Sequence, residues 1–429
     1  MELLSHFKRW SKQEFTRNSF TLLSTSTLAQ LITFAVYPII TRLYSTQDLG
    51  VLNLWLSIIA VLAILSTGRY EPAIVMEKED SGARALWQLT LLVNLGVLII
   101  GQLAFTVFAH PIASLCKNPE GIEPWLPFIP LMVLLMGLWQ GLNNYCIRQK
   151  HFKSIGEYNL VKSTVNSGLK VGFGFAGFLR SGLITSTLIA FASALAWSLI
   201  RVKVKIRELF RWDWQEMKAM AKKYANFPKF EMPHAMSNTL ASNLPILILP
   251  LSFGMDQIGL FSLALMIGFC PVNLFTNSMD QVLYKSVVDR RQKEEPVCPL
   301  IANFCKKTAL VLLPFFVVFF FIAEWFFGLL FGTEWIQAGE YFKILLPWLF
   351  LVTMTSSLTF IPKIFFKQRT AMLIEFTYII LRVLALCVGI WMQSFVAAII
   401  CFSAVSAVMV AIQLIWYFCL IKRNEPCRK

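Results

Sequence analysis

The stretch that decides the fold reads TALVLLPFFVVFFFIAEWFFGLLF and covers residues 308–331, where Glu324 is the only charged residue. A helix of about 20 apolar residues crosses a bilayer, so this stretch predicts a transmembrane helix. Residues 87–108, 126–147 and 395–421 meet the same requirement. Because 57% of the residues are hydrophobic and 15% are charged, the chain is predicted to be an all-α polytopic membrane protein.

The basic residues divide the loops between apolar stretches into two classes. Nearly all of the 39 Lys and Arg residues lie in alternate segments, which are 1–18, 66–86, 148–162, 200–233, 279–308, 363–370 and 422–429. The intervening loops hold only Arg42, Lys117, Arg180 and Lys343. Positive loops stay in the cytoplasm, so the pattern predicts about twelve transmembrane helices with both termini cytoplasmic. The net charge of +15 then meets anionic membrane lipids and does not indicate nucleic acid.

The longest basic segment follows the sixth predicted span and divides the chain into two halves. We predict a cytoplasmic interfacial N-terminus (1–18), an N-lobe of helices 1–6 (19–199), a basic cytoplasmic linker (200–233), a C-lobe of helices 7–12 (234–421) and a cytoplasmic tail (422–429). Residues 43–56 align with residues 252–265, so that Gly50 meets Gly259 and Leu54 meets Leu263. The two lobes are thus predicted to form a parallel repeat. The alternative is two similar periplasmic turns.

Several stretches, spread in order along the chain, resemble one transporter family. They are 38–50 (PIITRLYSTQDLG), 67–76 (TGRYEPAIVM), 222–230 (KKYANFPKF), 259–284 and 331–350. The chain resembles the bacterial oligosaccharide flippases of polysaccharide biosynthesis, the Wzx-type O-antigen transporters. These belong to the multidrug/oligosaccharidyl-lipid/polysaccharide exporter superfamily.

This resemblance implies an activity and its partners. The expected cargo is an O-antigen-like oligosaccharide on undecaprenyl diphosphate, moved by alternating access from the cytoplasmic to the periplasmic leaflet of the bacterial inner membrane. H+ or Na+ is the expected coupling ion, and a polysaccharide polymerase and assembly proteins are the expected partners in polysaccharide or lipopolysaccharide biosynthesis. No cofactor is expected. The alternative is a small-molecule or multidrug/ion antiporter of the same superfamily.

An enzyme is the weakest reading of the sequence. No P-loop sequence occurs, and residues 172–177 (GFGFAG) match a dinucleotide fingerprint only inside a span, without the strand that such a site needs. The longest outer loop, 109–125, has only Glu120 and Glu123 as acids. The four His residues are far apart, and no metal site or disulfide framework is predicted.

Ionisable residues inside the spans are the first candidates for a binding site, since charges are costly in a bilayer. Lys170 follows Asn166 on the fifth predicted span, and Arg382 follows Tyr378 and Glu375 on one face of the eleventh. Arginine suits phosphate, and lysine acts as a point charge. We predict that Lys170 and Arg382 attract the lipid diphosphate or acidic sugars in a central cavity. Alternatively, Arg382 pairs with Glu375, and Lys170 pairs elsewhere or snorkels.

Polar residues on the first span are further candidates for the cavity. Gln30, Thr33 and Tyr37 continue a stripe that begins at Ser26. Their hydroxyl and amide groups could bind sugars, and the same groups often hold transmembrane helices together. Both interpretations stay open at this stage.

Charged residues near the spans predict a gate and an ion-coupling site. Arg69, Glu71 and Asp280 could form and break charge pairs at a cytoplasmic gate, or they are ordinary interfacial charges. Glu375 and Glu324 are the acids expected to bind a coupling ion, and Glu375 is the stronger candidate.

Overall fold

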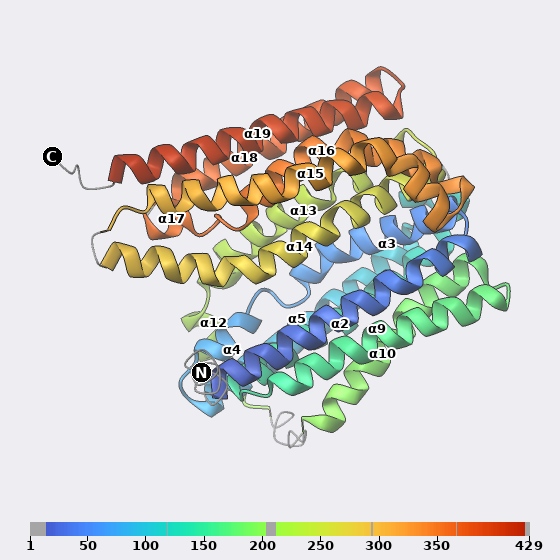
Figure 1. Cartoon of the computed structure of the whole chain (residues 1–429). Helices are drawn as coiled ribbons and strands as arrows, with labels where there is room; N and C mark the ends of the chain where they lie inside the picture. Colours follow the sequence, from blue (N-terminus) through green and yellow to red (C-terminus); the bar gives the residue numbers. More distant parts are fainter. Residues whose placement is uncertain (1–13, 118, 203–211, 293–294, 366, 425–429) are drawn as a thin grey trace, which may run out of the picture. The chain divides into compact units, whose positions relative to one another are not determined.

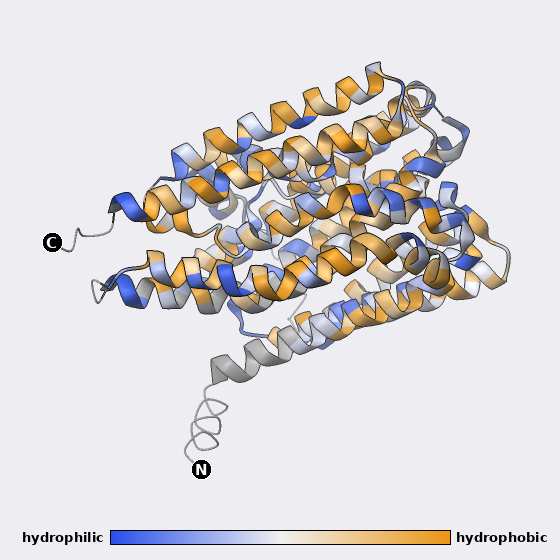
Figure 2. Ribbon diagram, turned by 45° about the horizontal axis from the view of Figure 1, so that its top comes forward, coloured by the Kyte–Doolittle hydropathy of each residue, from blue (hydrophilic) through white to orange (hydrophobic). Residues whose placement is uncertain are grey.

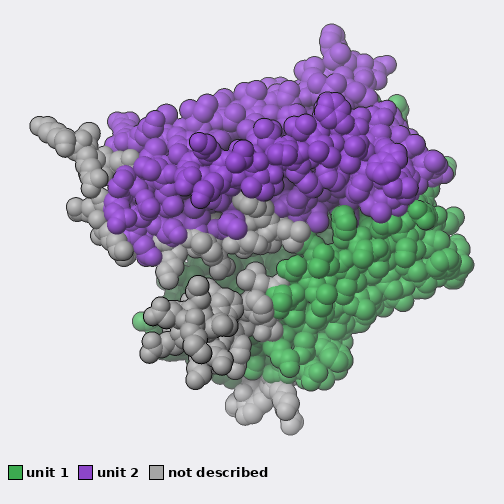
Figure 3. Space-filling view, in the orientation of Figure 1, with its two compact units in different colours: residues 1–255 green, residues 256–429 purple. Residues whose placement is uncertain are grey.

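The computed structural model describes residues 14–117, 119–202, 212–292, 295–365 and 367–424, without some side chains at 14–23, in 274–292, and at 363 and 424. Every element in these ranges is a helix (Figure 1). The predicted N-terminal segment, linker and tail therefore lie partly outside the described residues. The chain divides into two compact units, residues 1–255 and residues 256–429, coloured separately in Figure 3.

Unit 1 is a bundle of long helices joined by short ones. Its elements are α2 (Glu14–Leu43), α3 (Thr46–Leu65), α4 (Glu71–Met76), α5 (Asp80–Val107), α6 (Ala109–Ser114), α7 (Pro119–Ile122), η1 (Glu123–Phe128), α8 (Ile129–Arg148), α9 (Phe152–Phe175), α10 (Leu179–Arg201), α12 (Trp214–Lys223), η2 (Phe227–Glu231), α13 (Met232–Ile248) and η3 (Leu249–Leu251). Helix α9 packs between α2 and α10, α5 packs on α8, and α13 packs on α3.

Unit 2 begins with the helix that the repeat alignment pairs with α3. Its elements are α14 (Met255–Gln292), α15 (Cys298–Phe331), η4 (Thr333–Trp335), α16 (Ile336–Ser356), α17 (Ile361–Ile364), α18 (Gln368–Trp391) and α19 (Phe395–Asn424). Thr46 and Met255 occupy equivalent positions in the alignment of 43–56 with 252–265, and each begins a helix. Helix α19 packs on both α16 and α18, and α15 packs on α16.

Nine helical stretches of the described residues are long and apolar enough to cross a membrane. They include most of each of the four stretches from which the prediction started, in α5, α8, α15 and α19. Hydrophobic residues run along the helices, and hydrophilic ones gather towards the helix ends (Figure 2). The chain is therefore an all-helical, multi-pass membrane protein, as predicted. Helices α9, α13 and α16 are not among the nine, so the count of twelve stays a prediction.

Local chemistry fixes the start of α3. Ser45 precedes the helix, and its side-chain oxygen accepts a hydrogen bond from the backbone N–H of Asp48. The Asp48 carboxylate in turn accepts from the backbone N–H of Ser45, which completes a capping box. The same buried carboxylate pairs with Arg180, whose Nε lies 3.0 Å from its Oδ1. Capping and ion pairing therefore join the start of α3 to α10 inside unit 1.

Candidate functional site

Arg382 lies in a cage of aromatic rings in unit 2. It belongs to α18, and only 7% of it is exposed. The centre of its guanidinium group lies 4.0 Å from the ring centroid of Tyr378, 4.9 Å from that of Phe402 and 5.1 Å from that of Trp348. Its Nε donates to Ser406 Oγ at 3.0 Å, and its Nη2 donates to the Tyr378 hydroxyl. Side chains of α16, α18 and α19 thus surround one buried cation.

The cage orients the guanidinium group through hydroxyl groups and aromatic faces. Hydroxyl groups and aromatic faces attract a cation but carry no full negative charge. Tyr378 and Arg382 lie together, as their spacing on one helical face predicts. Glu375, on the same predicted stripe, lies at an exposed position of α18. The aromatic cage therefore presents a rigid, planar cation, which is the geometry that suits phosphate.

Lys170 is buried in unit 1 in a different setting. It lies on α9 and is 8% exposed. Its backbone carbonyl accepts a hydrogen bond of 2.6 Å from the Tyr44 hydroxyl. Within the described part of the chain, no carboxylate forms an ion pair with its ammonium group. Because an isolated buried charge is costly, such a lysine is a candidate ligand for an anion.

A row of polar groups joins α2 to α9, and we call it the polar seam. Thr33 Oγ1 lies 2.8 Å from Ser163 Oγ, and Ser163 donates to the backbone carbonyl of Ala29 at 2.6 Å. Asn159 Nδ2 donates to Ser26 Oγ at 3.4 Å. These contacts are the ones expected if hydroxyl and amide groups hold the two helices together. A role of Thr33 in sugar binding stays a prediction.

The other predicted cavity residues of unit 1 lie near this seam in sequence. Gln30 is half-buried and Tyr37 is buried, both on α2. Asn166 lies on α9, and its Oδ1 accepts a hydrogen bond of 3.4 Å from Thr187 of α10. The structure thus places Asn166 at the contact of α9 with α10, on the helix that also carries Lys170.

Glu324, a predicted ion-coupling residue, is engaged in an ion pair. Its Oε1 lies 2.5 Å from Nζ of Lys343, which joins α15 to α16. Gly339 allows this close approach, because a Cβ atom there would lie 2.7 Å from the Cα of Glu324. Lys343 therefore neutralises Glu324, whereas Glu375 sits at an exposed position.

The predicted gate residues Arg69 and Glu71 meet at the turn between α3 and α4. Arg69 has a backbone φ of 57°, and its Nη1 lies 3.3 Å from Oε1 of the buried Glu71. Its Nη2 lies 3.3 Å from Oε1 of Glu231, in η2. The side chain of Asp280 lies outside the described residues. The structure therefore adds Glu231, which the sequence analysis did not single out.

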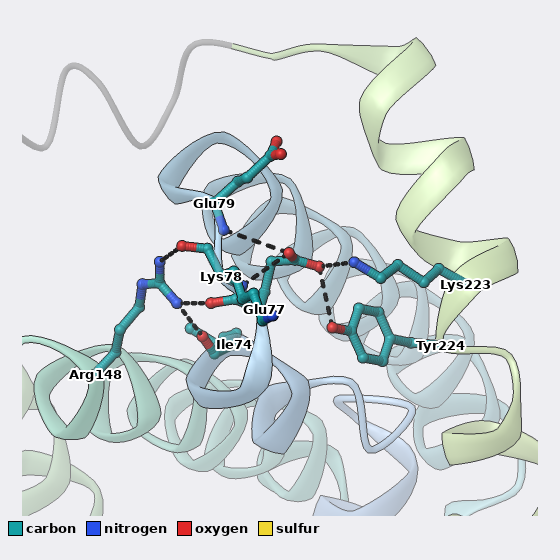
Figure 4. A network of polar contacts seen from close by, with 7 residues as sticks. All are labelled: Ile74, Glu77, Lys78, Glu79, Arg148, Lys223 and Tyr224. Carbon is teal, nitrogen blue, oxygen red and sulfur yellow. Dashed lines mark hydrogen bonds and ion pairs between the residues drawn. The ribbon is translucent and has the colours of Figure 1, made fainter.

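A second missed group surrounds Glu77, which follows α4 (Figure 4). Its Oε2 accepts from Lys223 Nζ at 2.5 Å and from the Tyr224 hydroxyl at 3.0 Å. Its Oε1 accepts from the backbone N–H groups of Lys78 at 2.8 Å and Glu79 at 3.4 Å. The hydrogen bond from Lys223 is the largest of several that together lower the pKa of Glu77 to about 2. We call this group the Glu77 cluster.

Sequence contains one signal for this cluster. Lys223 and Tyr224 lie in KKYANFPKF (222–230), a stretch that already stood out by its resemblance to the flippases. Their partner Glu77 is far away along the chain, so a single sequence does not reveal that these residues are in contact.

Comparison with solved structures defines the class of the fold. The chain is similar to the lipid II flippase MurJ in its inward closed conformation, with a TM-score of 0.69 and 10% identity over 94% of this chain and 90% of the other. It is also similar to an inward-facing multidrug resistance MATE family transporter of the MOP superfamily, with a TM-score of 0.67 and 13% identity over 95% and 99% of the two chains. At such identities the likeness shows the fold alone. The chain has the two-lobed fold of MOP superfamily transporters.

The family follows from the sequence comparison. Residues 39–340 match the model of the polysaccharide biosynthesis protein family, and the chain belongs to that family. A curated relative is the succinoglycan biosynthesis transport protein ExoT of Rhizobium meliloti (strain 1021), which is 22% identical over 339 residues. The alignment covers 77% of this chain, and the chain spans 64% of the length of that relative. The resemblance on which the sequence prediction relied is confirmed at the level of the family.

Proposed function

We propose that the chain is a flippase, which moves an oligosaccharide linked to undecaprenyl diphosphate from the cytoplasmic to the periplasmic leaflet. The main support for the proposal is that one chain shows both a family match and a similarity in fold. The family match relates residues 39–340 to polysaccharide biosynthesis, and the fold is that of a lipid II flippase. A lipid-linked saccharide is the cargo that satisfies both.

The two buried cations suit an anionic lipid headgroup. A diphosphate carries negative charge and several acceptor oxygens, which a guanidinium group can bind through two parallel N–H donors. Arg382 provides such a group with its plane fixed by rings, and Lys170 provides a second, more flexible charge. We propose that both residues attract the diphosphate or acidic sugars, while Gln30, Thr33, Tyr37 and Asn166 contact the glycan.

We further propose that an H+ or Na+ gradient drives transport by alternating access, with Glu375 as the first candidate for the coupling site. Arg69 and Glu71 then serve a cytoplasmic gate with Asp280. The distribution of basic loops supports an inner-membrane location with both termini in the cytoplasm. Reporter fusions at residue 424 and within 109–117 test this topology, because only the second should report the periplasm.

A deletion strain of the source bacterium tests the activity. Undecaprenyl-diphosphate-linked repeat units should accumulate on the cytoplasmic face, and the native chain should remove them. Polymerase and assembly proteins, the proposed partners, remain intact in this strain. The absence of such accumulation, together with a gain in drug sensitivity, would overturn the proposal.

The second candidate is a small-molecule or multidrug/ion antiporter. The likeness to a MATE family transporter favours it, since the two chains match over almost their whole lengths. Drug efflux from cells that express this chain, without any effect on lipid-linked saccharide, would establish this alternative.

A further inference from the structure

The short helix α12 packs on the corner formed by α4 and α5 in unit 1. Met217 of α12 is 2% exposed. Met220 of the same helix packs with Tyr224 and Phe227 against a buried apolar cluster of α4 and α5. The cluster consists of Ala73, Ile74, Ala83, Leu86, Trp87 and Leu91. Apolar burial therefore fixes one face of α12, which belongs to the connection between α10 and α13.

Glu77 supplies the polar half of this contact. The residue is only 5% exposed, and both its oxygens are engaged. Oε1 binds the N–H groups of its own turn, while Oε2 binds Lys223 and Tyr224 at the end of α12 (Figure 4). A carboxylate that accepts this many charge-assisted and neutral hydrogen bonds is strongly held.

Arg148 of α8 holds the other side of the same turn. Its guanidinium group donates to the backbone carbonyl of Glu77, to that of Ile74 at 3.3 Å and to that of Lys78 at 3.1 Å. It also pairs with Asp80 at 2.8 Å. The turn that presents Glu77 is thus fixed from inside the bundle.

The fit is close enough to exclude even a methyl group. A Cβ atom at Gly82 would lie 2.9 Å from Cγ of Glu77 and 3.2 Å from Sδ of Met220. The Glu77 side chain cannot move aside to avoid the first clash, because both oxygens of its carboxylate are held by hydrogen bonds. Glycine at this position therefore allows α12 to approach α5.

We propose that Glu77 is a latch, which holds the end of α12 on the α4–α5 corner and so fixes the point where η2 begins. Only Ala225 and Asn226 separate Tyr224 from η2. At the far end of η2, Glu231 is bound to Arg69. The segment 223–231 is thus tied at both ends, and loss of the Glu77 tie frees the end of α12 and the start of η2 to move, while Glu231 still holds the end next to α13.

The latch is expected to stay closed at physiological pH. A carboxyl group whose pKa is lowered from 4.5 to about 2 stabilises the folded contact above pH 4.5 and loses this stabilisation as the pH falls towards 2. The charged or titratable groups around it are Lys223 at the end of α12, Tyr224 directly after it, Arg148 from α8, and Lys78, Glu79 and Asp80 on its own side of the contact. The latch is therefore a mechanical tie rather than a pH sensor.

Hydrogen–deuterium exchange on the full-length protein in nanodiscs tests the latch. Glu77→Gln removes the charge and should raise exchange in peptides covering 214–226 about threefold, the effect expected for loss of one partly exposed charge pair. Glu79→Gln and Lys222→Met are matched controls that should leave this exchange unchanged. The Glu79 carboxylate is turned away from the contact (Figure 4), and Lys222 lies at an exposed position of α12. Equal exchange in Glu77→Gln and Glu79→Gln would overturn the proposal.

Two further variants separate the latch from general damage to the fold. Lys223→Met should raise the exchange as Glu77→Gln does, and the double variant should add little, because both changes remove one interaction. Gly82→Ala should raise the exchange without removing any charge. Exchange in α8 and the second half of α5 should stay at the native level throughout. A spread of the effect to those helices, or full additivity in the double variant, would reject a specific latch.

Discussion

The two units bury a cation in different ways. In unit 2, Arg382 is enclosed by three aromatic rings and two hydroxyl groups, which fix the plane of its guanidinium group. In unit 1, Lys170 lies on α9, which bonds to hydroxyl groups of α2 and α10, and its backbone carbonyl accepts a hydrogen bond from Tyr44. The aromatic cage fixes the orientation of the Arg382 guanidinium group, whereas Lys170 provides a positive charge without such a cage. The first should be sensitive to shape and the second to charge.

The largest effect is expected at Arg382. Arg382→Ala should lower transport about 100-fold, because truncating a buried, hydrogen-bonded charge commonly costs several kcal/mol. Arg382→Lys should recover only part of the activity, since lysine keeps the charge without the planar contacts. Export of the repeat unit in a complemented deletion strain is the measurement. Arg423→Ala, at an exposed position of α19, is the control and should be close to native. Full activity of Arg382→Lys would show that the cage does not set geometry.

Removing the charge of Lys170 should lower transport less than removing Arg382. Lys170→Met keeps most of the unbranched side chain and removes the charge, and we expect about a tenfold loss of transport. Lys162→Met on the same helix is a matched control. Its ammonium group lies over the rings of Tyr158 and Phe191, at 5.5 and 5.1 Å from their centroids, and we expect little change. Similar losses in both variants would mean that the charge of Lys170 has no special role.

Within unit 2, the two glutamates should differ in ion coupling. Glu375→Gln should slow ion-driven flux about threefold, while Glu324→Gln should have less effect, because Lys343 already neutralises Glu324. Flux into vesicles under an imposed H+ or Na+ gradient is the measurement. An equal or reversed order of the two variants would contradict this assignment and would leave the cage as the only functional feature proposed for α18.

The comparison also shows how far sequence alone could reach. Hydropathy was sufficient to predict a helical, multi-pass membrane protein, and helical spacing was sufficient to place Tyr378 beside Arg382. The other rings of the cage, Trp348 and Phe402, come from α16 and α19, and no spacing rule connects them to Arg382. Glu77 was missed for the same reason, because its partner Lys223 lies in a separate helix. Local periodicity is visible in one sequence, whereas contacts between distant helices require the fold.

The smallest expected effect concerns the polar seam and separates its two interpretations. Thr33→Val and Ser163→Ala each remove one partner of the 2.8 Å hydrogen bond between α2 and α9. If the seam only holds helices together, each change should cost about 1 kcal/mol or less of stability, and the double variant should cost less than their sum. Thermal unfolding in detergent provides the measurement, and transport should stay native.

Transport measurements on the same variants test the other interpretation, in which the polar side chains of α2 bind the sugar cargo. A hydroxyl that binds sugar contributes to cargo affinity, so its loss should lower transport without lowering the unfolding temperature. The Gln30→Leu variant extends the test along α2, since its amide is half-buried and lies one turn from Thr33. If Thr33→Val and Gln30→Leu both lower transport while Ser163→Ala does not, α2 contacts the cargo. Unit 1 would then contribute cargo contacts in addition to the charge of Lys170. The difference between unit 1 and the aromatic cage of unit 2 would be smaller than proposed above.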